Sequence, residues 1–250
     1  MQFKKSNVAQ VVALALLAVS AAPVMAQSAG DNIVSTGWVH IAPQDSSTPL
    51  SITSPASLAG PIPNSGASVK STDTLGFSIT HFFTNNWAGS FDLGIPPTYK
   101  LEGTGSLAAV GQIGEAKQLA PTLIAKYFFG QPQSVFRPFV GLGASRVSYT
   151  GVSLTDTFQG AVRNTLAYDT AGQVIAVGTS AKLEDSWASV FNVGASYAIN
   201  KDWYAGFSLS YLKLKTKADL TTQSNVGPIM STTTLTLNPI VTYLSIGYRF

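Results

Sequence analysis

The last seven residues of the chain alternate strictly between apolar side chains and small or polar ones. One set of alternate positions holds Leu244, Ile246, Tyr248 and Phe250, and the other holds Ser245, Gly247 and Arg249. A period of two is typical of a β-strand whose two faces meet different surroundings. The pattern therefore predicts that the chain ends in a strand with one apolar face and one polar face.

A final strand that closes on phenylalanine, with tyrosine two residues earlier, resembles the last strand of bacterial outer-membrane β-barrels. In such barrels the apolar face of each strand meets lipid, and the other face meets the lumen. We accordingly expect the strand that ends at Phe250 to be recognised by the barrel-assembly machinery.

The N-terminus shows the pattern of a secretory signal. A positively charged start precedes an apolar run from Val8 to Val19, and small residues ending at Ala26 follow it. The run is shorter than the roughly 20 residues of a membrane-spanning helix, and a cleavage site comes after it. We expect residues 1–26 to be a cleaved signal peptide and residues 27–250 to be the barrel domain. A retained N-terminal anchor is the alternative.

Composition favours a membrane barrel over a soluble sandwich. Only 11% of the residues are charged, whereas soluble domains average roughly 25%. After Val19 no stretch approaches the length of a spanning helix, yet the chain has 22 glycines and 10% aromatic residues. It has no cysteine, so disulfides and thiol chemistry play no part in it.

The charge excludes a nucleic-acid partner. The formal net charge is +3, and it falls to about +1 when Lys4 and Lys5 leave with the signal peptide. Nucleic-acid binding would need lysine and arginine clustered on one face. The one basic cluster, Lys213, Lys215 and Lys217, alternates along a strand. We expect this cluster to lie at a strand end that projects above the membrane.

Eight segments show strand patterning. They cover residues 33–42, 70–83, 87–95, 115–129, 136–149, 184–199, 203–215 and 232–250. The short connections at 84–86, 130–135 and 200–202 contain Asn, Asp or Gly, which tight turns prefer. The long connections cover 43–69, 96–114, 150–183 and 216–231. This alternation predicts an all-β fold, an eight-stranded antiparallel transmembrane β-barrel with short periplasmic turns and long extracellular loops.

Aromatic residues gather at the strand ends beside the short turns. They are Phe83, Trp87, Phe129, Phe136, Trp203, Tyr248 and Phe250. Such a ring is typical of the aromatic girdle at a membrane interface. Several of the expected strands exceed the roughly 9 to 11 residues that cross a bilayer, so the barrel should rise above the outer leaflet. Eight strands enclose a narrow interior, which argues against a wide aqueous pore.

Seven short motifs resemble the OmpW family, which includes the AlkL-type alkane importers. They are Asn64-Ser65-Gly66, Leu75-Gly76-Phe77, residues 113–123, Tyr127-Phe128-Phe129-Gly130, residues 136–143, Asp185-Ser186-Trp187 and Gly247-Tyr248-Arg249-Phe250. The resemblance runs from about Gly37 to the C-terminus, and it is carried by the order and spacing of the motifs. The long first and third loops depart from it, which leaves the choice of substrate open.

The resemblance implies passive uptake of small hydrophobic molecules through an apolar channel that is blocked towards the periplasm. The solutes would leave sideways into the outer membrane, so outer-membrane lipid and lipopolysaccharide are the expected partners. Lipid accepts an apolar solute, whereas delivery to water gains it little.

The family's constriction corresponds to Leu75 and Trp187. Strand parity instead groups Leu75 with Phe77, and Trp187 with Phe191, on outward faces. A β-bulge would reverse the facing of the residues beyond it. The sequence therefore allows both orientations.

Four charged residues near the short turns fall on inward faces by parity. They are Asp92, Lys126, Arg137 and Arg249. Charges in a narrow lumen need partners or water to offset the cost of desolvation. We expect them to form a polar plug that blocks passage to the periplasm, a role compatible with ion pairs that stabilise the barrel.

An enzyme is not expected. His40 and His81 are the only histidines, and antiparallel strands place them at opposite ends of the barrel, so they cannot share a site. No metal-ligand spacing or nucleotide motif is present, and no cofactor is expected. The alternative to a channel is a surface receptor or structural barrel whose loops bind phage, bacteriocin or host surfaces.

Overall fold

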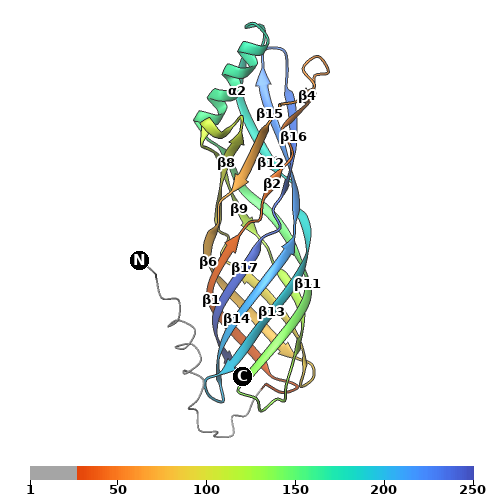
Figure 1. Ribbon diagram of the computed structural model, residues 1–250, viewed down its shortest axis with the longest axis vertical. Helices are drawn as coiled ribbons and strands as arrows, with labels where there is room; N and C mark the ends of the chain where they lie inside the picture. Colours follow the sequence, from red (N-terminus) through yellow and green to blue (C-terminus); the bar gives the residue numbers. More distant parts are fainter. Residues whose placement is uncertain (1–26) are drawn as a thin grey trace, which may run out of the picture.

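The computed structural model describes residues 27–250, and the expected signal peptide lies outside them. Eight antiparallel strands form a closed ring (Figure 1). In ring order they are β1 (Asn32–Ala42), β6 (Thr72–Phe82), β7 (Trp87–Gly94), β10 (Thr122–Phe128), β11 (Phe136–Leu154), β13 (Ser186–Ala198), β14 (Trp203–Lys213) and β17 (Ile240–Arg249). The eight-stranded antiparallel barrel is confirmed.

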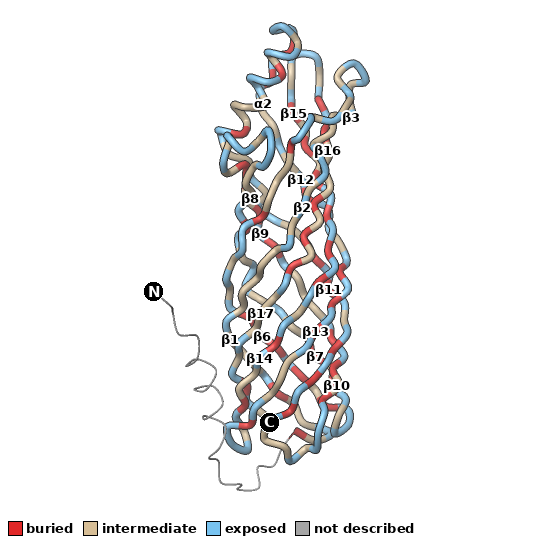
Figure 2. Tube along the Cα trace, viewed as in Figure 1, coloured by how far each residue is buried: buried red, intermediate tan, exposed pale blue. Residues whose placement is uncertain are grey.

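The outer surface of the ring is apolar. Its exposed side chains include Trp87, Phe91 and Leu93 on β7 and Trp203, Phe207, Leu209 and Tyr211 on β14. The residues between them face the lumen, as the two-residue period of a strand requires. Figure 2 shows this alternation of exposed and buried positions along the strands. Beside the short turns, aromatic rings pack edge to face, as in the pairs Trp87–Tyr127 and Trp203–Tyr248.

The long connections are folded, which the strand pattern did not predict. Outside the ring, the described part of the chain has nine further strands, two of which (β9 and β16) overlap expected strand segments: β2 (Ser46–Ser47), β3 (Ser51–Ser54), β4 (Gly60–Pro61), β5 (Ser65–Val69), β8 (Thr98–Gly105), β9 (Gln112–Leu119), β12 (Ala176–Leu183), β15 (Lys215–Ser224) and β16 (Ile229–Thr236). Most of these strands continue the wall into an extension on the side of the ring away from the C-terminus (Figure 1).

Two expected strands are each divided into two. The segment expected at 115–129 breaks between β9 and β10 at Ala120 and Pro121, where proline has no N–H for the ladder. The segment expected at 232–250 breaks between β16 and β17, where Asn238 has a φ of 36°. Both breaks lie where the ring meets the extension.

The third long connection contains a helix that was expected to be loop. Helix α2 (Asp156–Asp169) begins after Thr155, whose hydroxyl accepts a hydrogen bond from the Phe158 N–H at 3.3 Å. This is an N-cap, which satisfies one of the free N–H groups of the first turn. A single 3-10 turn, η1 (Ala108–Val110), lies in the second long connection. Among the described residues, no helix is long and apolar enough to cross a membrane.

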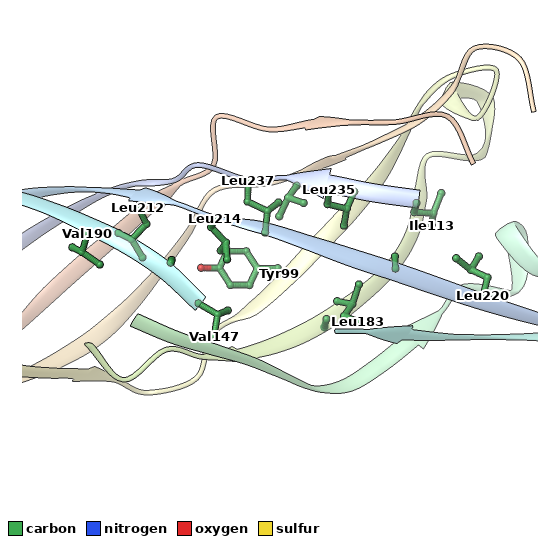
Figure 3. Close-up of a cluster of buried hydrophobic side chains, with 14 of the residues drawn as sticks. Tyr99, Ile113, Val147, Leu183, Val190, Leu212, Leu214, Leu220, Leu235 and Leu237 are labelled. Atoms are coloured by element: carbon green, nitrogen blue, oxygen red, sulfur yellow. The ribbon is translucent and has the colours of Figure 1, made fainter. Parts of the chain in front are cut away.

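The main hydrophobic core lies where the ring meets the extension. Figure 3 shows its side chains pointing into the interior from strands on opposite walls. Tyr99 of β8 lies among Val147, Leu212 and Leu214, and Leu235 and Leu237 continue the cluster. The interior of the extension is therefore apolar.

Candidate functional site

An apolar cavity of about 70 Å³ lies inside the extension. Its walls include Leu101, Ile113, Val152, Leu220 and Leu235. Phe158 of α2 also lines it and is 2% exposed. We call it the upper cavity.

A narrow passage leads from the upper cavity to the ring. A small cavity of about 20 Å³ shares Leu101, Ala116, Leu183 and Leu235 with the upper cavity. It shares Ile41, Tyr99, Gln118 and Pro239 with a larger cavity of about 130 Å³, the middle cavity. Burial raises the pKa of Tyr149, which lines the passage, to about 12, and it raises the pKa of Tyr99 as well. Both phenols therefore stay neutral.

The barrel wall is interrupted beside the middle cavity. The ladder between β7 and β10 ends at the pair Asp92–Thr122, and the ladder between β8 and β9 begins at Thr98–Lys117. A backbone hydrogen bond spans the interval, from the Gln118 N–H to the Pro97 carbonyl at 3.2 Å. Pro96, Pro97 and Pro121 flank the interval, and none of them has an N–H to donate. We call this interval the wall gap.

The middle cavity reaches the wall gap. Gly94, Pro97 and Ala120 line the cavity at the gap. Phe77 and Leu93 also line it, although their side chains are exposed on the outside of the barrel. Strand patterning did not single out Pro96, Pro97 or Pro121 as candidate site residues. Proline within an otherwise strand-like pattern was the signal available for them.

The end of the lumen beside the short turns is closed by aromatic rings and one arginine. Phe82, Phe128, Phe139 and Tyr204 form a buried cluster there. Arg137 is 1% exposed, and its guanidinium donates to the Gln27 carbonyl at 2.8 Å and to the Asn85 carbonyl at 2.6 Å. The same guanidinium lies 5.4 Å from the centre of the Phe128 ring. We call this group the floor.

The other three charged residues of the expected plug also face inward, at different heights. Arg249 pairs with Asp31 at 3.3 Å near the floor. Lys126 is 8% exposed, lies over the Phe139 ring and lines a cavity of about 60 Å³, the lower cavity. Asp92 lies higher, in the lining of the middle cavity, and accepts a hydrogen bond from the Ser78 hydroxyl at 2.5 Å. The four charges therefore do not form one cluster.

Leu75 and Trp187 lie outside the lumen, which contradicts their assignment to a channel constriction. Their exposed fractions are 44% and 68%, and the guanidinium of Arg146 lies 5.8 Å from the Trp187 ring. The pairing of β1 with β6 and of β11 with β13 runs past both residues without a shift in register. Because there is no bulge to reverse the facing, the parity of the strands holds.

The two histidines lie apart, as expected. His40 pairs with Asp73 at 2.8 Å, and the His81 ring lies 2.9 Å from the Asn32 side chain. The register of β1 with β6 places these two contacts at opposite ends of the strand pair. Within residues 27–250 no group of three His, Cys, Asp or Glu side chains could hold a metal ion.

Comparison with known proteins agrees with this architecture. The model of the OmpW family matches residues 28–250. The chain is 31% identical to outer membrane protein W of Vibrio cholerae, over 94% of this chain and 95% of that protein. It is 27% identical to outer membrane protein AlkL of Ectopseudomonas oleovorans, over 76% of this chain and 72% of AlkL.

The solved structures include the same barrel. The crystal structure of the outer membrane protein OprG from Pseudomonas aeruginosa matches with a TM-score of 0.75 and 25% sequence identity, over 91% of this chain and 99% of OprG. The barrel therefore lies in the bacterial outer membrane, with its short turns in the periplasm and its extension outside. The chain belongs to the OmpW family of outer-membrane proteins.

Proposed function

We propose that this barrel carries small hydrophobic molecules into the outer membrane by passive diffusion. A solute enters the upper cavity from outside, passes Tyr99 into the middle cavity and leaves through the wall gap into lipid. The observation that carries the proposal is the row of cavities that share lining residues, with an apolar upper part and a middle cavity that reaches the wall gap.

The lining of the path favours apolar solutes over polar ones. The upper cavity and the passage are lined mainly by leucine, isoleucine, valine and alanine side chains. A sugar that entered would lose hydrogen bonds to water and find few partners, which costs free energy for each unsatisfied group. An alkane loses nothing of this kind, so we expect discrimination by polarity more than by size.

The floor and the wall gap together give the path its direction. Below the middle cavity, the lower cavity is lined by polar groups such as Ser35, Thr80 and Lys126, and the aromatic floor follows it. An apolar solute is not favoured there. At the wall gap it meets Phe77 and Leu93, whose side chains face the membrane. Leaving the cavity for the lipid therefore lowers the free energy of an apolar molecule.

The family membership also supports the proposal. The motifs of this chain resemble those of the AlkL-type importers of alkanes, and AlkL aligns over 76% of the chain. Members of the family are outer-membrane barrel proteins, so the path is read as a channel rather than an active site.

Uptake of an alkane and of a sugar of similar size, by cells with and without the protein, tests the proposal. We expect faster entry of the alkane and unchanged entry of the sugar. Faster entry of both would identify a general pore. Unchanged entry of both, with barrel assembly confirmed, would favour the surface receptor or structural role.

A disulfide across the wall gap tests the lateral exit. Continuing the Asp92–Thr122 register by two residues places Gly94 opposite Ala120. The chain has no cysteine of its own, so Gly94→Cys with Ala120→Cys gives a single bridge. Oxidation should slow alkane uptake, and a reductant should restore it. The control pair is Gly89→Cys with Ala125→Cys, two facing residues in the intact part of the same ladder. If both pairs act alike, the exit is elsewhere.

A further inference from the structure

The outer surface of β11, β13 and β14 changes from apolar to basic side chains where the ring meets the extension. The pairing of β11, β13 and β14 aligns Leu142, Phe191 and Tyr211 in one row, and all three side chains are exposed. The next outward row aligns Ala144, Ser189 and Lys213, and the row after it holds Arg146 beside Trp187. The apolar surface therefore ends in a basic one where the ring meets the extension.

Two lysines of this surface have no acidic partner within the described residues. Lys213 and Lys215 are exposed and take part in none of the ion pairs of residues 27–250. They are separated by Leu214, whose side chain is buried, so both ammonium groups project outward. Alternate residues of a strand are about 6.6 Å apart, which lets two lysines approach one phosphorylated headgroup.

We call Arg146, Lys213, Lys215 and Lys217 the patch. Two of its side chains, those of Arg146 and Lys217, already form ion pairs. Arg146 pairs with Asp185 at 3.2 Å, and Lys217 pairs with Asp219 at 3.0 Å and with Glu184 at 3.7 Å. The hydrogen bond with Asp219 raises the pKa of Lys217. These pairs hold their side chains in place beside the two free lysines, which leaves Lys213 and Lys215 as the cations open to an external anion.

The other side of the barrel differs at its outer boundary. On β1 and β6, Trp38 stacks on His40, and His40 pairs with Asp73. No lysine belongs to this group. Both sides carry a tryptophan at the boundary, as membrane interfaces do, and on the side of Trp187 the basic side chains of Arg146 and Lys213 lie in the adjoining outward rows.

We propose that Lys213 and Lys215, with Arg146 beside Trp187, bind the phosphate groups of a phosphorylated glycolipid in the outer leaflet. The acyl chains would pack on Leu142, Phe191 and Tyr211, and the phosphates would lie one to two rows higher, against the basic side chains. Basic side chains beside the apolar band of a membrane protein attract anionic lipid headgroups in this way, and lysine binds phosphate as a point charge. The site lies on the outer wall, apart from the proposed solute path.

The thermal unfolding of the purified protein in neutral-lipid nanodiscs tests the site. Lipid A with two phosphates should raise the melting temperature by several degrees, and the dephosphorylated lipid with the same acyl chains should raise it less. Lys213→Glu with Lys215→Glu should abolish the phosphate-dependent part. Equal stabilisation of the unaltered protein by both lipids would overturn the proposal.

Two further variants and one soluble probe complete the test. Lys100→Glu with Lys117→Glu makes the same charge change at exposed positions of β8 and β9, outside the rows that hold Lys213 and Arg146, and should keep the phosphate effect. An equal loss in this control would show a general electrostatic effect and reject the site. Lys213→Gln with Lys215→Gln should also lose the effect, which covers the case that the glutamate variant does not fold. Inorganic phosphate alone should not reproduce it, and if it does, the lipid assignment is wrong.

Discussion

Arg137 closes the periplasmic end of the lumen by joining segments that are far apart in the sequence. Its guanidinium binds the carbonyls of Gln27 and Asn85, which belong to the N-terminal segment and the first short turn. It also lies over the rings of Phe82 and Phe128. A buried arginine needs such acceptors, because a charge without partners is costly away from water. Parity predicted the inward face of Arg137, but not these partners.

Replacing Arg137 with methionine should open the floor and destabilise the barrel. The Gln27 and Asn85 carbonyls would lose their donor, at a cost of about 1–3 kcal/mol for a buried group. Denaturant unfolding measures this loss, and ion conductance in planar bilayers measures the leak. Arg146→Met, on the outer surface, is the control. An unchanged conductance in a destabilised Arg137→Met barrel would show that the aromatic rings alone close the lumen.

Burial of Tyr149 makes the extension sensitive to high pH. Its pKa rises from 10.0 to about 12, so the folded state favours the neutral phenol. The contribution of Tyr149 to stability is complete below pH 10 and is lost as the pH rises from 10 to 12, because the unfolded tyrosine ionises first. Tyr149→Phe should reduce the fall in melting temperature across this window. Tyr168→Phe, at an exposed position, should leave it unchanged, and equal behaviour of the two variants would contradict this reading.

At the scale of elements, proline and a helix shape the proposed solute path. Pro96, Pro97 and Pro121 interrupt the ladder where β7 and β10 give way to β8 and β9, so the wall opens at a fixed height. Helix α2 packs on the upper cavity through Phe158, while the ring of eight strands closes without the helix. The helix is therefore an addition to the extension and not a part of the ring.

Shortening Phe158 to alanine should widen the upper cavity. The lost burial of a phenyl ring costs about 3 kcal/mol, and this loss falls on the packing of α2 rather than on the ring of strands. Uptake of a bulky apolar probe should therefore rise relative to a slim one, with the melting temperature of the barrel unchanged. Tyr168→Ala on the exposed face of the same helix should change neither rate. An unchanged ratio in Phe158→Ala would place the size limit elsewhere.

At the scale of the whole molecule, the last strand closes the cylinder. β17 pairs with β1 on one side and with β14 on the other, so the ends of the domain meet in the wall. The Phe250 and Asn32 backbones exchange hydrogen bonds at 3.0 and 3.2 Å. The Phe250 side chain is 67% exposed on the outer surface. We propose that the barrel-assembly machinery recognises this ring before insertion, because the folded barrel makes little use of it.

Replacing Phe250 with alanine should reduce assembly in cells far more than it reduces stability. An exposed ring contributes little to the packing of the folded barrel, whereas a receptor for the final strand would lose its aromatic anchor. The folded fraction in outer membranes should fall, and the melting temperature of refolded protein should change little. Leu244→Ala, on the same face of β17, is the control. An equal loss of folded protein in both variants would argue against a specific role of Phe250.

The sequence by itself determined the ring: strand number, outward faces and the order of short and long connections follow from period-two patterning and turn residues. These signals are local, because each side chain's facing depends only on its place along one strand. The wall gap, the floor and the folded extension were decided by the tertiary structure. Each depends on contacts between distant segments, such as Arg137 with Gln27, or Pro97 with Gln118. Strand periodicity depends on one strand at a time and contains no information on such pairings. Parity therefore placed Leu75 and Trp187 on the outer surface correctly, whereas the cavities of the proposed solute path depend on the folded barrel.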